Sequence, residues 1–133
     1  MREFKLEVLT PDGVAFDGVA ESLLLRTDDG DVEILAGHVD YMASVGTGRA
    51  RILTGGEEKL ASASGGFVTV EGGKVRLIAT TFEFAEDIDL ERAERAKAKA
   101  EEMLRRAESE KAEEIAKAKL KRAMSRIGIA SMK

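Results

Sequence analysis

Residues 86–93 read EDIDLERA, and the character of the sequence changes at this stretch. Before it, apolar residues alternate with polar ones and paired glycines recur. After it, alanine, lysine, arginine and glutamate predominate, with no glycine until Gly128. Alternation of period two predicts β-strands, whereas strong helix formers without glycine predict helices. The sequence therefore predicts an α+β fold with two domains, a β-rich one over residues 1–86 and a helical one over residues 87–133.

The first domain is predicted to consist of short strands joined by tight turns. The clearest hairpin is FVTVEGGKVRLIA (67–79), in which two alternating segments flank a pair of glycines. Residues 4–8 also alternate, and the run TPDG (10–13) closes that strand. Other apolar clusters occur at 23–25, 32–35 and 50–53. No helical stretch separates these segments, so the pattern indicates a sandwich or barrel rather than a βαβ fold.

The second domain is predicted to be a helical hairpin. Apolar positions three and four residues apart define one face of a helix over about 89–107 and of a second over about 112–127, with a polar break between them. Many of these positions are alanine, which buries little apolar area, so the helices themselves are favoured but their packing is weak. A ligand can shift such a hairpin between two states. An ordinary hairpin that stays docked explains the same pattern.

Charge is distributed unevenly along the chain. Residues 1–86 hold 8 basic and 15 acidic side chains, whereas residues 87–133 hold 13 basic and 10 acidic ones. From Ile115 onward there are six basic residues and no acidic one. This block indicates an acidic protein partner or a phosphate-bearing ligand, although a solvated helix face explains it equally well. Nucleic acid is disfavoured, because the net charge is -4 and the helical domain has no aromatic residue on which a base would stack.

Several functional classes are excluded by the composition. The chain has no cysteine, which removes disulfides, thiolate metal sites and thiol nucleophiles. The one histidine, His38, has no second histidine with which to share a metal, and no nucleophile or metalloprotease motif is present. No apolar run approaches the roughly 20 residues that span a bilayer, and the N-terminal residues alternate unlike a signal peptide. We therefore expect a non-enzymatic protein that is cytosolic or peripheral to a membrane, with no direct membrane insertion.

Four stretches, taken in order, carry a resemblance to a known family. They are LEVLTPDGVAFDG (6–18), ASGGFVTVEGGKVRLIA (63–79), AEDIDLERA (85–93) and LKRAMSRI (120–127). Through them the chain resembles the epsilon subunit of bacterial F-type ATP synthases over essentially its whole length. One departure lies at residues 33–38, where Glu33 and Ala36 replace the first glycine and the proline of a run that is usual in the family.

The resemblance implies a sandwich of about ten short antiparallel strands followed by a two-helix antiparallel hairpin. It also implies a non-catalytic subunit of the rotating central stalk, peripheral at the cytoplasmic face of the cell membrane, whose sandwich binds the gamma subunit and the c-ring. The folded hairpin would permit turnover. The extended hairpin would meet acidic segments of the alpha and beta subunits and block ATP hydrolysis, through the basic residues Lys117, Lys119, Lys121, Arg122 and Arg126.

In some members of the family the folded hairpin binds ATP, which would be a regulatory ligand and not a required cofactor. The family's motif is an isoleucine or leucine, an aspartate, two variable residues, an arginine and an alanine, matched here by Ile88, Asp89, Arg92 and Ala93. Similar members also use a glutamate and two arginines, matched by Glu83, Arg122 and Arg126. Lys99 stands where ATP-binding relatives have an arginine, and lysine keeps the charge but lacks the two-pronged donor.

Simpler interpretations of these residues remain open. Asp89 at the start of a helix caps it, and Arg92 forms a nearby surface ion pair, whether or not a ligand binds. At the level of the whole protein, the alternatives are a stand-alone ATP-sensing module and a purely structural stalk subunit whose hairpin never moves.

Overall fold

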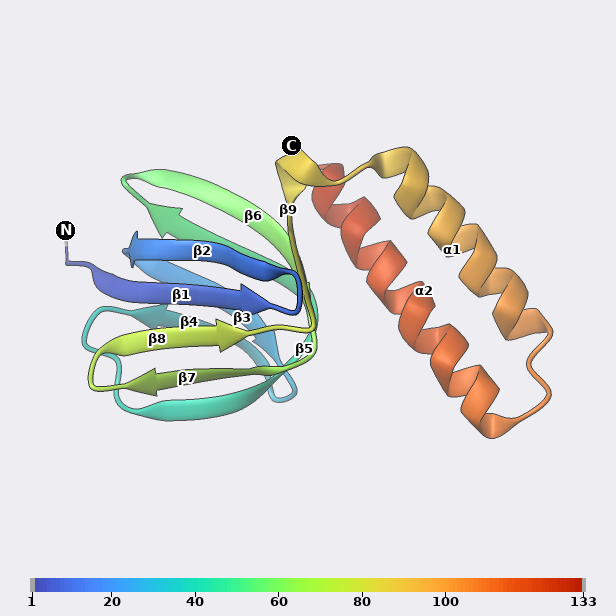
Figure 1. Cartoon of the computed structure of the whole chain (residues 1–133), viewed down its shortest axis with the longest axis horizontal. Helices are drawn as coiled ribbons and strands as arrows, with labels where there is room; N and C mark the ends of the chain where they lie inside the picture. The colour runs from blue at the N-terminus through green and yellow to red at the C-terminus, as the bar shows by residue number, and fades with distance from the viewer. Residues whose placement is uncertain (1, 133) are drawn as a thin grey trace.

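The computed structural model describes residues 2–132, which form a β-sandwich followed by two helices (Figure 1). The strands are β1 (Phe4–Thr10), β2 (Gly13–Ala20), β3 (Ser22–Thr27), β4 (Gly30–Leu35), β5 (Tyr41–Thr54), β6 (Glu57–Ser64), β7 (Phe67–Glu71), β8 (Lys74–Ile78) and β9 (Thr81–Phe84). A short 3-10 helix, η1 (Ala85–Asp87), leads into α1 (Leu90–Arg105) and α2 (Glu110–Ala130). The predicted domain boundary after residue 86 falls inside η1. The α+β class, with a sandwich before two helices, is confirmed.

The two sheets of the sandwich share strand β5. Its residues Tyr41–Ser44 pair with β7, whereas Gly48–Thr54 pair with β6. One sheet runs β2-β1-β8-β7-β5. In the other sheet β3 and β6 pair with β5, β4 pairs with β3, and β9 pairs with β6. Two details differ from the expectation. Residues 2–132 contain nine strands rather than ten, because the long β5 serves both sheets, and β1 pairs with β8 in parallel rather than antiparallel fashion.

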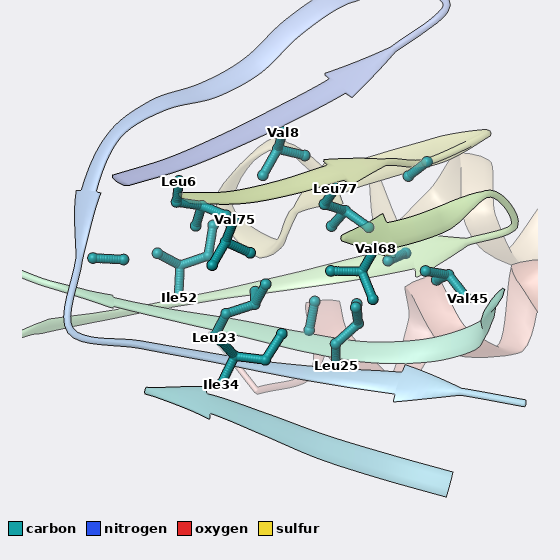
Figure 2. Close-up of a cluster of buried hydrophobic side chains, with 14 of the residues drawn as sticks. Leu6, Val8, Leu23, Leu25, Ile34, Val45, Ile52, Val68, Val75 and Leu77 are labelled. Atoms are coloured by element: carbon teal, nitrogen blue, oxygen red, sulfur yellow. The ribbon is translucent and has the colours of Figure 1, made fainter. Parts of the chain in front are cut away.

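The sandwich core comes from the inward-facing residues of both sheets. Figure 2 shows Leu6 and Val75 on one side and Leu23 and Ile52 on the other, with their side chains pointing toward one another. All four are essentially inaccessible to solvent. Alternate residues of a strand face opposite sides of its sheet, so one apolar set per strand suffices to fill the space between the layers.

The hairpin predicted at residues 67–79 is present. Strands β7 and β8 pair from Phe67↔Ile78 to Glu71↔Lys74. The two central turn residues, Gly72 and Gly73, have φ of 58° and 81°. A two-residue turn with both φ values positive matches the right-handed twist of the strands, and glycine adopts these angles at least cost.

Both helices begin at side-chain caps. The Asp89 carboxylate accepts a hydrogen bond from the Arg92 backbone N–H at 3.1 Å, and the Ser109 hydroxyl accepts one from Ala112 N–H at 3.0 Å. Helix α2 continues past Gly128 to Ala130, three residues beyond the predicted end. The continuation is explained by burial, because Ile129 and Ala130 pack into an apolar cluster that offsets the glycine.

Alanines form the seam between the helices. The buried residues of α1 are Ala93 and Ala100, and those in the first two-thirds of α2 are Ala116 and Ala123. Figure 1 shows the helices side by side and antiparallel, projecting away from the sandwich. Neither helix, over the described residues, is long and apolar enough to cross a lipid bilayer.

A second, smaller apolar cluster joins the base of the hairpin to the sandwich. Its buried members are Ala85, Ile88, Ala93, Ile129 and Ala130, with Leu60 of β6 and Ile127 packed against them. Beside this cluster, the hydroxyls of Ser62 in β6 and Ser125 in α2 lie 2.7 Å apart and share a hydrogen bond. The hairpin is therefore attached mainly through its C-terminal end.

Candidate functional site

A cleft of about 430 Å³ opens where the hairpin meets the sandwich. The hairpin side contributes Asp89, Arg92, Ala93, Ala96 and Arg126, and the sandwich side contributes Thr10, Asp12, Thr80, Thr81, Phe82 and Glu83, with Asp87 of η1 between them. Its volume lies within the range of small-molecule sites. The cleft exists only while the helices are folded against the sandwich, because its two walls belong to different domains.

The predicted motif at residues 88–93 divides into polar and apolar members. Asp89 and Arg92 are exposed and line the cleft. Ile88 and Ala93 are only 4% and 3% exposed and belong to the small cluster at the base of the hairpin. The apolar pair therefore fixes where α1 starts, and this position directs Asp89 and Arg92 toward the cleft.

Glu83 and Arg126 form an ion pair that bridges the two domains. Arg126 Nε lies 3.3 Å from Glu83 Oε1, and both side chains remain partly exposed, at 30% and 39%. An ion pair with this much solvent access contributes about 1 kcal/mol or less, so it orients Arg126 more than it stabilises the fold. Arg126 is thereby held at the cleft with further donors available.

A second groove, of about 260 Å³, continues from the cleft along the helices. Arg126 and Ala96 line both spaces. The groove adds Lys99 from α1 and Arg122 from α2, so the cationic residues suggested by the resemblance lie along one continuous surface. Within residues 2–132, Arg92, Lys99 and Arg122 have no acidic partner within ion-pair distance, whereas Arg126 has Glu83.

The arrangement can bind a ligand that has both an anionic group and a neutral polar group. The cleft and the groove are lined by four positive side chains, Arg92, Lys99, Arg122 and Arg126, and the N-terminus of α1 contributes a partial positive charge nearby. Hydroxyls and carboxylates line the sandwich side, where they offer acceptors to sugar or amino groups. No group of three or more histidine, aspartate or glutamate side chains in residues 2–132 is placed to hold a metal ion.

Sequence reasoning missed the sandwich wall of the cleft. Thr10 and Asp12 lie in the β1–β2 turn, and Thr80 and Thr81 lie where β9 begins. The run TPDG was recognisable as a turn, and the Thr10 hydroxyl does accept a hydrogen bond from Asp12 N–H at 3.1 Å. Nothing in the sequence indicated that this turn would face residues more than seventy positions away.

Comparisons with known proteins match the whole length of the chain. Residues 3–85 match the family model described as ATP synthase, Delta/Epsilon chain, beta-sandwich domain, and residues 86–131 match the model of the long alpha-helix domain. The chain belongs to the ATP synthase delta/epsilon family. It is 40% identical to the ATP synthase epsilon chain of Ruminococcus albus over 134 residues, covering 100% of both chains. It is 36% identical to that of Bacillus velezensis, covering 98% of each.

Solved structures from the same kind of complex share the fold. A chain in a cryo-EM structure of the Euglena gracilis mitochondrial ATP synthase, comprising OSCP, F1 and c-ring, superposes with a TM-score of 0.81 at 21% identity, covering 98% of this chain and 82% of that one. A chain from the central stalk and c-ring of the Tetrahymena thermophila mitochondrial ATP synthase gives 0.57 at 13% identity, covering 96% and 93%. At these identities the likeness establishes the fold alone.

Proposed function

We propose that this protein is the epsilon subunit in the central stalk of an F-type ATP synthase, where it is non-catalytic, binds the gamma subunit and the c-ring, and is peripheral at the cytoplasmic face of the cell membrane. The observation that carries this proposal is the match of both domains, end to end, to epsilon chains of bacterial ATP synthases. An adaptor of this kind needs surfaces for partners and no catalytic groups.

An exposed apolar surface supports a protein partner for the sandwich. Leu35, Val39 and Met42, at and beside the β4–β5 connection, are 52%, 75% and 72% exposed. Apolar side chains that gather on a surface are typical of binding sites for other proteins. The opposite end of the sandwich carries the hairpin, so both attachments are sterically compatible (Figure 1).

We expect the purified protein to form a stable complex with the gamma subunit, detectable by size-exclusion chromatography. Met42→Asp should weaken this complex about tenfold or more, because a charge would be desolvated in an apolar contact. Ile115→Asp, at an exposed position on α2, is the matched control and should bind normally. If the wild-type protein and gamma elute separately, the stalk assignment is wrong.

The regulatory part of the proposal concerns the hairpin. The contacts that hold it to the sandwich are a small apolar cluster, the Ser62–Ser125 hydrogen bond and the exposed Glu83–Arg126 ion pair. Such modest contacts leave a small free-energy difference between the docked and the extended hairpin. A ligand or partner that prefers one state can therefore shift the equilibrium toward it. We propose that the extended hairpin inhibits ATP hydrolysis by contacting the alpha and beta subunits with its basic residues.

The docked hairpin is proposed to bind ATP. The phosphates would bind to the positive side chains of Arg92, Lys99, Arg122 and Arg126. Asp89 would cap α1 and accept a hydrogen bond from the ligand. Glu83 would orient Arg126. Ile88 and Ala93 would hold the motif in place from the apolar cluster. Since the site needs both domains, ATP would bind the docked state alone and shift the population toward it.

Calorimetric titration of ATP and ADP into the isolated protein tests this site. We expect saturable ATP binding that is tighter than ADP binding and at least about tenfold weaker in Arg92→Ala, because hydrogen bonds to charged groups contribute about 1.5–3 kcal/mol. Arg95→Ala removes an arginine of α1 that does not line the cleft and should bind ATP like the wild type. If millimolar ATP produces no heat change, the proposal of nucleotide sensing is wrong, whereas the proposed stalk role is unaffected.

A further inference from the structure

The groove between α1 and α2 contains a positive side chain, Lys119, that is not among the ATP-binding residues implied by the resemblance. The charged side chains that line the groove are Lys99, Lys119, Arg122 and Arg126. On α2 the three basic residues are spaced by three and four positions, which places them on one face of the helix. Lys119 therefore extends the cationic surface along the groove, away from the sandwich.

The structure separates Lys119 from the other lysines of the same basic run. Lys117 Nζ lies 2.8 Å from Glu113 Oε1, and this hydrogen bond raises the pKa of Lys117 and lowers that of Glu113. Lys121 is exposed and does not line the groove, since residues two apart on a helix face different directions. Lys119 lines the groove, and no acidic side chain among residues 2–132 pairs with it.

Four positive charges line one groove and repel one another, and within residues 2–132 the only carboxylate at ion-pair distance from them is that of Glu83, which engages Arg126. A ligand with several adjacent negative charges would relieve this repulsion more effectively than a monovalent anion. The groove is open enough for the flexible lysine stems to adjust to the ligand, which suits a phosphate chain rather than a rigid anion.

We propose that Lys119 is a further nucleotide-binding residue, which contacts the terminal phosphates of ATP beside Lys99 and Arg122 and strengthens the preference for a triphosphate over a diphosphate. This inference rests on the proposed nucleotide-binding function of the docked hairpin. Lys119 supplies additional positive charge in the groove where Lys99 lacks the bidentate geometry of an arginine.

The test is a calorimetric titration of the full chain with ATP, ADP and inorganic tripolyphosphate. Lys119→Ala should weaken ATP binding about threefold to fivefold and ADP binding less, as expected for one solvent-accessible charge pair. Its ATP affinity should also fall less steeply with added salt, because one phosphate contact is missing. Lys119→Arg should retain the affinity. Lys121→Ala is the matched control and should bind ATP like the wild type.

The outcomes separate this inference from the function on which it rests. Tight ATP binding by the wild type together with unchanged binding by Lys119→Ala would overturn the role of Lys119 and leave the nucleotide site standing. An equal loss in Lys119→Ala and Lys121→Ala would also overturn it, because the effect would then reflect net charge alone. Absence of ATP binding to the wild type would overturn the nucleotide site itself. Thermal unfolding followed by circular dichroism verifies that every variant is folded.

Discussion

Gly66→Ala is expected to destabilise the sandwich by about 4 kcal/mol or more, which is exceptional for the addition of one methyl group. Gly66 lies between β6 and β7 with φ of +87°, a conformation that L-residues rarely adopt. A Cβ atom built there would lie 1.8 Å from the carbonyl oxygen of Ile78 and 3.0 Å from the Cα of Ala79. Both neighbours are backbone, so no side-chain rotation relieves the clash.

The clash would also disturb pairing between distant strands. The Gly66 carbonyl accepts a hydrogen bond from Val45 N–H at 2.9 Å, which anchors the middle of β5. Moving the glycine away from Ile78 would stretch this bond, at the place where β5 passes from one sheet to the other. We expect urea unfolding, followed by circular dichroism, to show a much lower midpoint with the same slope.

Gly72→Ala provides the matched control for this prediction. Gly72 also has a positive φ, 58°, but an added Cβ would meet no atom within 4 Å. Its cost should be limited to the left-handed conformation, about 1 kcal/mol. If the two variants lose similar stability, the close approach to Ile78 is not what requires glycine at residue 66.

The predictable parts of the fold were those with strong local signals. The β7–β8 hairpin and both helices follow from alternation, glycine pairs and helix-forming residues within short windows. Strands β2, β6 and β9 were not recognised. GVAFDGVA contains two glycines, EEKLASAS has small or polar residues at most positions, and TFEF has only 4 residues. Their strand conformation depends on pairing with β1, β5 and β6. The parallel β1–β8 pair joins residues about seventy positions apart, and no local pattern specifies it.

The candidate site shows the same division between local and long-range information. Asp89 and Arg92 share one helical turn, so their proximity is evident from spacing. The proximity of Glu83 and Arg126 was suggested by the resemblance to a family, because the sequence alone does not specify how α2 packs against the sandwich. The threonines and Asp12 on the sandwich wall carry no motif, and Lys119 differed from Lys117 and Lys121 only once the helix faces were known.

A disulfide between positions 62 and 125 is expected to hold the hairpin against the sandwich and to abolish the proposed regulation by the hairpin. In Ser62→Cys/Ser125→Cys the thiols would replace two hydroxyls that lie 2.7 Å apart, one on β6 and one on α2. The two γ positions therefore need to approach only slightly more closely to reach the S–S bond length of about 2.0 Å. The chain has no cysteine of its own, so the introduced pair has no competing partner within the molecule.

In the isolated protein, the oxidised variant should be more stable than its reduced form by about 4 kcal/mol, because the bridge closes a loop of 63 residues in the unfolded chain. Urea unfolding with and without reductant measures this difference. The single variants Ser62→Cys and Ser125→Cys are the controls, and neither should respond to reductant. Failure of the double variant to oxidise would contradict the docked position of α2.

In the reassembled ATP synthase complex, the same bridge separates a mobile hairpin from an immobile one. If the extended hairpin inhibits hydrolysis, the oxidised enzyme cannot reach that state, so its ATPase rate should exceed the wild-type rate and return to it on reduction. If instead the ATPase rate is the same in both redox states, the hairpin does not adopt an inhibitory extended state, and its role is structural. The bridge leaves the proposed ATP site intact, because it lies on the face of α2 that meets β6 and neither serine lines the cleft. Nucleotide sensing would then act only by shifting a docking equilibrium whose existence this bridge tests directly.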